Sequence, residues 1–481
     1  MHVLAPRMKS LGRFLPASAI ATLLLACSPA ASPVEEGAAS APAVASSPVI
    51  AFVGVNVVPM DREQVLADHT VVVEDGRIVS VAPAAEAQVP EGAQRIEGDG
   101  RWLMPGLVEM HGHVPGSEPA GYAEDVLFLY VSNGVTTVRN MAGDASHLAL
   151  RERIARGELT GPTLFAASPW LNEEKAGTPE RAGQAVREYQ AAGFDLVKLG
   201  GIPPAAYVRM AQVAHEVGIP FAGHVPADVG LEGALEARQA SIDHLDGYVE
   251  FLVARDADTR GRDRRAFGAG LVDLVDPARI PLAVERTLAA GTWNVPTLSL
   301  MEHLAAEEPS ESMARWPEMR YLPRAVVDGW VKYKDEVQSR ESFQPATARR
   351  LVELRRQLLM ALHEAGAPIA LGSDAPQFFN VPGFSIHREM RMMAEAGMTP
   401  YEVLATGTRE AARYFGTPDA FGTIQPGRRA DLVLLDADPL QDLAHVQRRV
   451  GVMANGRWLP EAEIQSRLAQ VAAAVAQRDE G

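Results

Sequence analysis

Leu103-Met104-Pro105-Gly106-Leu107-Val108-Glu109-Met110-His111-Gly112-His113 is the stretch that decides the fold. An apolar β-like run ends in two histidines two residues apart, and this spacing puts both imidazoles on the same face of a strand. One metal ion can bind both rings, but the pair alone fits a hydrogen-bonded structural role equally well. The other strands of the chain must decide between these interpretations.

Seven further short apolar runs follow, each ending in polar residues and separated from the next by a helix-length segment. They span residues 135–140, 163–168, 195–200, 220–224, 241–244, 294–299 and 368–374. Helices are expected at 179–192 and 207–217, because glycine, an ordinary helix stop, follows each. Eight alternating units predict an α/β protein with a closed (β/α)8 TIM barrel.

Both ends of the chain carry β-rich runs with tight turns. Asp75-Gly76 and Asn455-Gly456 suit two-residue hairpins, in which glycine adopts a positive φ at little cost. We expect the two ends to form one small β-sandwich domain. The predicted domains are a signal segment (1–27), a tether (28–48), the first part of the sandwich (49–104), the barrel (105–419), the second part of the sandwich (420–461) and a C-terminal helix or tail (462–481).

The N-terminus has the character of an export signal. Three basic residues precede an apolar run at 14–26 that is too short to span a bilayer. Leu24-Leu25-Ala26-Cys27 resembles the bacterial lipobox, and Cys27 is the chain's single cysteine. A structural free thiol is the alternative, but the position favours lipidation of Cys27. Because Ser28 follows, we expect a lipoprotein on the bacterial outer membrane, facing the periplasm.

The composition excludes some classes of function. With 47% hydrophobic and 22% charged residues, the chain is typical of a globular protein. Its formal net charge of -16 opposes nucleic-acid phosphates, so we expect no nucleic-acid partner. We expect the protein to contact a membrane through its lipid anchor alone. The sequence allows a homo-oligomer.

Polar residues at the C-terminal ends of barrel strands meet at one mouth. Lys198 lies in an apolar strand, where a charged amine costs desolvation energy; a neutral amine can instead take up carbon dioxide to give a carbamate that bridges two cations. A buried salt bridge is the alternative. His224 and His244 end successive strands and can hold a second metal, although either alone fits a buried structural histidine.

Asp374 ends the last predicted strand. Its carboxylate can bind a metal and accept the proton of a bound water, which makes it the expected general base and acid. A helix N-cap is the alternative role for this residue.

Four further residues follow predicted strands and are expected to face the mouth, where they could hold a substrate carboxylate. Each has a structural alternative as an ion-pair, packing or surface residue. They are Arg139, Asn140, Tyr248 and His387.

In this order, these motifs resemble the amidohydrolase superfamily over roughly residues 49 to 460, and specifically its binuclear members with a carboxylated lysine. Residues 103–111 are similar to the family's entry into the first barrel strand, and residues 421–433 to its return to the sheet domain. The resemblance implies two divalent ions, usually zinc, with these ligands: His111, His113 and Asp374 for one ion, His224 and His244 for the other, and carboxylated Lys198 with a hydroxide as bridges.

Within the superfamily, the site segments look most like the prolidase-like or Xaa-Pro dipeptidase group, which is related to imidazolonepropionase. The single-metal imidazolonepropionases lack a lysine on the fourth strand, so Lys198 favours the two-metal hydrolases. Val225-Pro226 after His224 departs from the group's pattern and leaves the substrate undefined.

The expected reaction is hydrolysis of a peptide-like, N-acyl amino acid or dipeptide amide by a metal-bridging hydroxide, with Asp374 passing the proton to the leaving nitrogen. A lactonase, cyclic-amide hydrolase or phosphotriesterase could use the same site. An exported metal-binding relative without activity is the alternative from another class. Residues 301–350 are either a lid or a structural insertion.

Overall fold

A mixed sheet joins strands from both ends of the chain. The computed structural model describes residues 49–480, so Cys27, the signal segment and the tether lie outside the described residues. The strand order is β15-β14-β13-β5-β1-β2-β3, with β4 pairing with β1. The strands are β1 (Ile50–Val57), β2 (Leu66–Glu74), β3 (Arg77–Pro83), β4 (Gln94–Glu97), β5 (Trp102–Pro105), β13 (Leu432–Leu435), β14 (Arg449–Ala454) and β15 (Arg457–Pro460).

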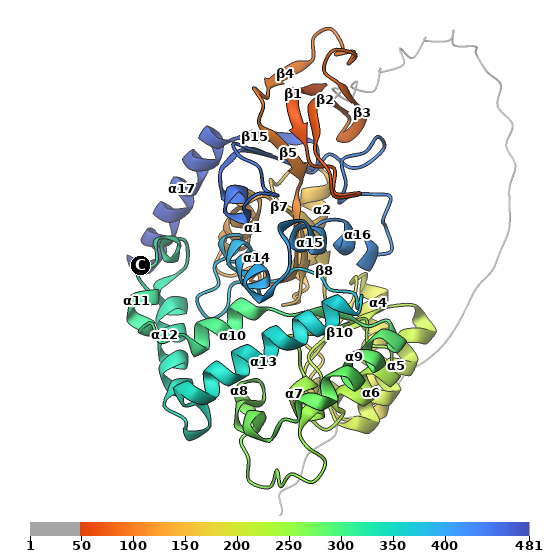
Figure 1. Cartoon of the computed structure of the whole chain (residues 1–481), viewed down its shortest axis with the longest axis vertical. Helices are drawn as coiled ribbons and strands as arrows, with labels where there is room; N and C mark the ends of the chain where they lie inside the picture. Colours follow the sequence, from red (N-terminus) through yellow and green to blue (C-terminus); the bar gives the residue numbers. More distant parts are fainter. Residues whose placement is uncertain (1–48, 481) are drawn as a thin grey trace, which may run out of the picture. The chain divides into compact units, whose positions relative to one another are not determined.

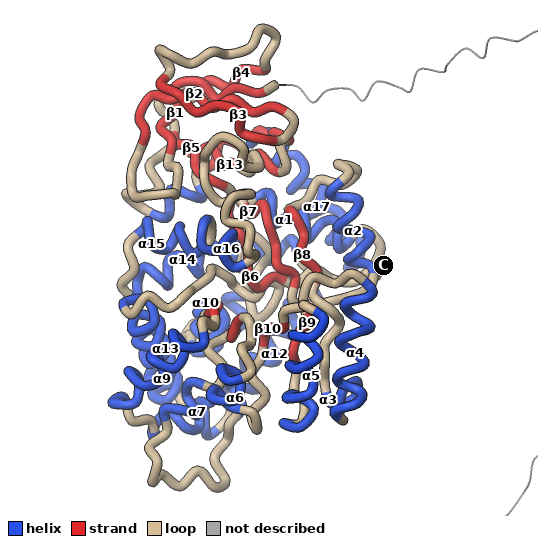
Figure 2. Tube along the Cα trace, turned by 90° about the vertical axis from the view of Figure 1, so that its right-hand side faces the viewer, coloured by secondary structure: helices blue, strands red, loops and turns tan. Residues whose placement is uncertain are grey.

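The eight strands form one continuous hydrogen-bonded sheet, because β5 pairs with β1 on one side and with β13 on the other. The sheet folds back on itself, since the ring centroids of Phe52 on β1 and Trp458 on β15 lie 5.2 Å apart and side chains of both chain ends share one core. This arrangement is compatible with the expected sandwich. Both predicted hairpin turns are confirmed, because Asp75-Gly76 and Asn455-Gly456 all have positive φ and join directly paired strands. Figure 2 shows β1 to β5 and β13 together at one end of the described unit.

The remaining strands form two short parallel sheets. One is β6 (Leu107–Gly112), β7 (Val135–Asn140) and β8 (Thr163–Ala166); the other is β9 (Val197–Leu199), β10 (Phe221–Gly223), β11 (Ser241–Asp243) and β12 (Trp293–Val295). Isolated parallel bridges join their edges at Ala167 with Leu196, at Asn294 with Ile369 and at Gly112 with Ala375. The fold is therefore mixed α/β with open sheets. The predicted strand at 368–374 is not regular: Ile369 within it and Ala375 just after it make single bridges, and no continuous strand forms.

Gly106 divides the run that was expected to be one strand. β5 ends at Pro105 in the mixed sheet, and β6 begins at Leu107 in the parallel sheet. Gly106 donates its N–H to Asp431 O at 2.8 Å, and a Cβ at this position would lie 2.2 Å from Thr136 Oγ1. Only glycine lets the backbone pass so close to β7 as it changes sheets.

Helices follow the parallel strands along the chain and pack outside them (Figure 2). They are α1 (Tyr122–Ser132), α2 (Ser146–Ala155), α4 (Pro179–Ala192), α5 (Pro204–Val217), α6 (Gly230–Glu236), α9 (Ile280–Ala290), α13 (Pro345–Glu364) and α14 (Phe384–Ala396). The helix predicted at 179–192 is confirmed as α4. Thr178 caps its first turn by accepting from Arg181 N, and Gly193 ends it with φ 88°.

The interval 301–350 is largely helical and packed. It contains most of α10 (Leu298–Ala305), then α11 (Ser310–Met313) and α12 (Arg324–Gln338), which lie near the C-terminal helix α17 (Glu461–Glu480) in Figure 1. The buried Lys334 of α12 donates to the backbone oxygens of His303, Ala306 and Glu308, each at 2.9 Å. Within residues 49–480, no helix is both long and apolar enough to cross a membrane.

Candidate active site

Three of the predicted metal ligands form a tight cluster. The ligand atoms of His111, His113 and Asp374 all lie within 4.8 Å of one another. His111 lies on β6. Asp374 lies beside it because the next residue, Ala375, forms a parallel backbone bridge with Gly112 of β6. Residues more than 250 positions apart therefore meet at one point, as expected for the C-terminal edge of parallel strands.

The spacing of these atoms fits a metal ion. Two ligands of one tetrahedral zinc, each about 2.0 Å from the ion, lie roughly 3.3 Å apart. His113 Nε2 lies 3.2 Å from Asp374 Oδ1, and His111 Nε2 lies 3.7 Å from the same oxygen. Among the described residues, His113 Nε2 and Asp374 Oδ1 are buried without a hydrogen-bond partner. Unpartnered buried donors and acceptors are rare in proteins, so a shared ligand explains their convergence.

Lys198 reaches into this cluster from β9. Its side chain is fully buried, and Nζ lies 3.0 Å from His111 Nε2. Burial lowers the pKa of Lys198 to about 8, although Asp243 and Asp374 raise it. A larger fraction of the amine is thus neutral near neutrality than for an exposed lysine, and the neutral amine is the form that reacts with carbon dioxide. Gly223 leaves room for the chain, because a Cβ there would lie 3.0 Å from Lys198 Cδ.

His224 and His244 lie beside the cluster, with ring centroids 4.8 Å apart. His224 Nδ1 lies 2.7 Å from Asp246 Oδ2, and His244 Nδ1 lies 2.9 Å from Thr297 Oγ1. These contacts orient both rings with Nε2 as the remaining ligand atom. His244 and Asp374 both have φ 62°, a backbone conformation that is uncommon outside glycine and that accumulates at functional sites.

Burial keeps His111, His113 and His244 neutral. Burial lowers the pKa of His111 and of His244 well below its ordinary value, and it lowers that of His113 to about 3. Neutral imidazole is the form that binds a metal. Burial likewise raises the pKa of Asp374 well above its ordinary value, although Lys198 opposes this shift. A divalent ion would restore the carboxylate form by supplying positive charge.

Arg139 does not face the mouth, contrary to expectation. It is fully buried and donates to both carboxylate oxygens of Asp243, at 3.0 and 3.1 Å. It also donates to Met110 O, Ser241 Oγ and Tyr414 OH. The guanidinium is therefore occupied in holding Asp243, whose Oδ2 lies 2.7 Å from His111 Nδ1.

Asn140 and Tyr248 are likewise committed to the protein interior. Asn140 Oδ1 accepts from the N–H of Val114, and its Nδ2 lies 2.7 Å from His147 Nδ1. The Tyr248 hydroxyl donates to Asn294 Oδ1 at 2.9 Å and is fully buried. Both side chains fix loops or strands, and neither is placed to bind a substrate.

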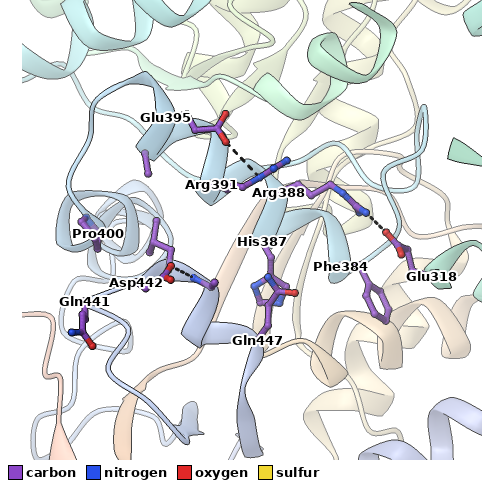
Figure 3. A pocket seen from close by; sticks show the side chains of 13 residues that line it. Glu318, Phe384, His387, Arg388, Arg391, Glu395, Pro400, Gln441, Asp442 and Gln447 are labelled. Carbon is purple, nitrogen blue, oxygen red and sulfur yellow. Dashed lines mark hydrogen bonds and ion pairs between the residues drawn. The ribbon is translucent and has the colours of Figure 1, made fainter. Parts of the chain in front are cut away.

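His387 lies in another part of the molecule. It lines a pocket of about 720 Å³ together with Phe384, Arg388 and Gln447, as Figure 3 shows. None of the cluster residues lines this pocket. The expectation that His387 faces the mouth is therefore wrong, because α14 turns it toward the segment around Gln447.

Four other histidines were expected to be structural or solvated. They make local contacts in the structure: His69 with Ala67 O, His215 with Ala237 O, His363 with Glu402 and His445 with Asp438 O.

Sequence reasoning missed several residues around the cluster. The buried Glu109 accepts from the N–H of His111 and from both the N–H and the hydroxyl of Ser373, so it ties the two metal-binding segments together. The sequence did carry a signal for Glu109: an acidic residue two positions before His111, within an otherwise apolar strand. Asp246, two residues after His244, gave a similar one. Trp170 lies 5.9 Å from Lys198 Nζ and follows a strand end in the sequence.

A mixed α/β scaffold presents a buried His-His-Asp cluster and a lysine at the edge of parallel strands, an arrangement that fits a metal-dependent hydrolase. The model of the Amidohydrolase family matches residues 102–459, and the chain belongs to this family. The family is generally metal-dependent, and its members act on small molecules, hydrolysing carbon-nitrogen bonds.

The relatives fall into two groups. Imidazolonepropionases of Pseudomonas aeruginosa (strain UCBPP-PA14) and Caulobacter vibrioides (strain NA1000 / CB15N) are each 26% identical over 404 residues, which cover 79% of this chain and 90% of theirs. The structure of a candidate prolidase from Bifidobacterium longum is 25% identical with a TM-score of 0.65, covering 88% of this chain and 99% of that one. A Xaa-Pro dipeptidase with bound methionine, 18% identical, shares the fold with a TM-score of 0.63, covering 86% of this chain and 100% of that one.

Proposed function

We propose that the chain is a two-metal amidohydrolase that cleaves an amide bond of a small N-acyl amino acid or dipeptide. The observation that carries the proposal is the fully buried Lys198, with Nζ 3.0 Å from a ring nitrogen of the His-His-Asp cluster. Within residues 49–480, Lys198 forms no ion pair, and His111 Nε2 is the side-chain contact of its amine. As a carbamate it would offer two oxygens to two cations.

The scaffold we propose for this site is a closed (β/α)8 barrel. The isolated bridges at Ala167, Asn294 and Gly112 lie where the two parallel sheets and residues 368–375 would have to meet. Backbone N–H groups of Ser168, Ala370 and His113 bond across the same three edges. These contacts support a ring in which the last strand is short and irregular.

The proposed ligands divide between two ions, preferably zinc. His111, His113 and Asp374 would hold one ion, His224 and His244 would hold the other, and Lys198, carboxylated, would be available to both. Bound divalent ions supply Lewis-acid activation of water and of the substrate carbonyl.

Asp374 accepts the proton of the attacking water and delivers it to the leaving nitrogen, which needs protonation to depart as an amine. Gln377 Nε2 donates to Asp374 Oδ2 at 3.3 Å and Oδ1 points at His113, so the carboxylate is held for this transfer. Asp246 and Thr297 keep the rings of His224 and His244 in place during the reaction.

The two groups of relatives differ in what they favour. The imidazolonepropionases match along most of the sequence. As a single-metal group, however, they are expected to lack a lysine at the position of Lys198. The similarity to the candidate prolidase is of the same order in identity and extends over more of both chains. Lys198 therefore decides for the two-metal, amide-cleaving group in this proposal.

The test is Lys198→Ala. We expect the variant to bind less metal and to lose most hydrolysis of an N-acyl amino acid panel, with partial recovery when short carboxylic acids replace the carbamate. Metal content is measured by elemental analysis alongside activity. Lys175→Ala, a change at an exposed lysine, is the matched control. Full activity of Lys198→Ala would exclude the two-metal site, and turnover of lactones or phosphotriesters alone would exclude amide cleavage as the function.

We also propose that the protein is exported and anchored to the outer membrane through a lipid on Cys27. The supporting observation is the lipobox-like Leu24-Leu25-Ala26-Cys27 after a basic and apolar segment. The test is membrane fractionation and mass spectrometry of the expressed chain beside Cys27→Ala. A wild-type chain that stays unprocessed, or that fractionates as the variant does, would refute lipidation.

A further inference from the structure

Trp170 is unusually exposed to solvent for a tryptophan beside the His-His-Asp cluster. Large aromatic side chains are buried on average, yet Trp170 leaves 48% of its surface exposed. Its ring centroid lies 5.9 Å from Lys198 Nζ and 5.8 Å from the ring centroid of His224. An apolar surface is thus held next to the groups that carry the proposed chemistry.

The loop that carries Trp170 is fixed by β9. Lys198 N donates to Ser168 Oγ at 3.1 Å, and Leu171 N donates to Lys198 O at 3.0 Å. Gly200 N donates back to Leu171 O at 3.1 Å. The indole is therefore attached to the backbone of Lys198 on both sides and is held in place before any ligand arrives.

The most exposed member of the cluster lies beside Trp170. The side chains of His224 and His113 are 33% and 16% exposed, whereas Lys198, His111 and Asp374 are closed to solvent. A substrate that reaches the cluster past His224 therefore passes Trp170, whose ring lies next to that histidine.

Phe267 adds a second aromatic surface. This half-buried ring lies 5.9 Å from the ring of His244, and its φ of 59° is strained for an aromatic residue. Below it, the guanidinium of Arg355 lies 5.6 Å from the ring centroid and donates to His244 O and Pro296 O.

The charges around the site favour an apolar substrate group. Two arginines near the cluster, Arg139 and Arg355, are buried and donate to protein acceptors. Neither guanidinium is free to hold a carboxylate, whereas the indole of Trp170 is open to contact.

Resting on the proposed amide hydrolysis, we infer that Trp170 is a specificity-determining residue and that the substrate class is an amide with an aromatic ring on its acyl side. The ring packs on the exposed indole, while the scissile carbonyl reaches the cluster, where Phe267 lies beside His244. Contact with one apolar wall typically changes kcat/KM by about 10- to 100-fold.

The experiment compares N-benzoylglycine with N-acetylglycine as substrates of the metal-loaded protein and of Trp170→Ala, Trp170→Phe and Val208→Ala. Val208 is 55% exposed on α5 and serves as the control for loss of an exposed apolar side chain. We expect the wild type to prefer the benzoyl substrate at least tenfold. Trp170→Ala should lower kcat/KM for it about 30-fold, mainly through KM, but only about threefold for the acetyl substrate, and Trp170→Phe should keep most of the preference.

A second readout separates this inference from the proposed function. Binding of N-benzoylglycine should quench tryptophan fluorescence more in the wild type than in Trp170→Phe, whether or not the amide is cleaved. Equal preference for both substrates in wild type and Trp170→Ala, or equal quenching in wild type and Trp170→Phe, would overturn the inference. Quenching that depends on Trp170 in a protein that cleaves no amide would refute the proposed function but support the aromatic wall.

Discussion

Replacing Arg139 by methionine should destabilise the protein strongly without acting on substrate binding. The change removes all five hydrogen bonds of the buried guanidinium, two of them to Asp243. Asp243 would keep the hydroxyl of Ser241 as a donor at 2.7 Å and its contact with His111 Nδ1 at 2.7 Å, but it would have no positively charged partner in direct contact. Removing one partner of a buried ion pair costs about 3–5 kcal/mol, so we expect a loss of this size in the free energy of unfolding at pH 7.

The loss should depend on pH in a defined direction. Burial raises the pKa of Asp243, but Arg139 and Lys198 outweigh it and hold the pKa below its ordinary value. In the wild type, the carboxylate therefore contributes stability above the unfolded pKa of about 3.9, and this contribution is lost as the pH falls through the lower folded pKa. Without Arg139 the folded pKa rises, so the deficit of Arg139→Met should be larger at pH 7 than at pH 4.

Urea unfolding followed by tryptophan fluorescence measures both effects. Arg139→Met/Asp243→Asn should recover more than half of the lost stability, because no unpaired charge stays buried. Arg151→Met, which breaks the partly exposed pair with Asp195, should cost about 1 kcal/mol or less. A deficit of Arg139→Met below about 1 kcal/mol, together with a raised KM for carboxylate-bearing substrates only, would refute the structural role and restore the expected binding role.

Three further predictions concern other parts of the structure. Burial raises the pKa of Glu389 to about 7, so the folded state holds a proton that the unfolded state releases above about pH 4.3. The free energy of unfolding should therefore fall by roughly 3 kcal/mol from pH 4.5 to 7. Glu389→Gln should reduce this pH dependence in thermal unfolding measured at both pH values. Lys334→Met removes the donor to the carbonyl oxygens of His303, Ala306 and Glu308, of which Ala306 O keeps Gln338 Nε2, and should cost about 2 kcal/mol in urea unfolding. Lys332→Met, at an exposed position, should change the free energy of unfolding by less than about 0.5 kcal/mol. A chelator should lower the unfolding temperature of the metal-loaded protein, and zinc should restore it. A ligand at 1,000 times its Kd adds about 4 kcal/mol to the free energy of unfolding. If an Asp374→Asn variant responded as strongly, the role of Asp374 as a metal ligand would be contradicted.

Regular elements were predictable where local patterns decide the backbone. The helix at 179–192 was predicted with its observed bounds, because Thr178, Pro179 and Gly193 are local start and stop signals. The strand at 135–140 was equally accurate, since every residue of β7 is buried and the run is continuous. The run at 294–299 was read too long, because α10 begins at Leu298 and its first N–H groups are bonded by Glu389 from a distant helix.

The site divides in the same way. His111, His113, Lys198 and Asp374 could be proposed as neighbours because strand ends converge whatever surrounds them. The direction of Arg139 and Tyr248 could not, because it depends on Asp243, Asn294 and Tyr414, which belong to other strands and helices. A long polar side chain near a strand end can turn toward the mouth or toward the neighbouring strand, and only tertiary partners decide which.

The pairing of β5 with β13 has a consequence for biosynthesis. Leu432 lies opposite Pro105 and Leu435 opposite Trp102, so one edge of β5 stays without its partner until more than 300 further residues have been made. A chain that has formed β1 to β5 but lacks β13 presents a bare strand edge, and such edges recruit other strands. A copy cut off before Leu432 would therefore be prone to self-association.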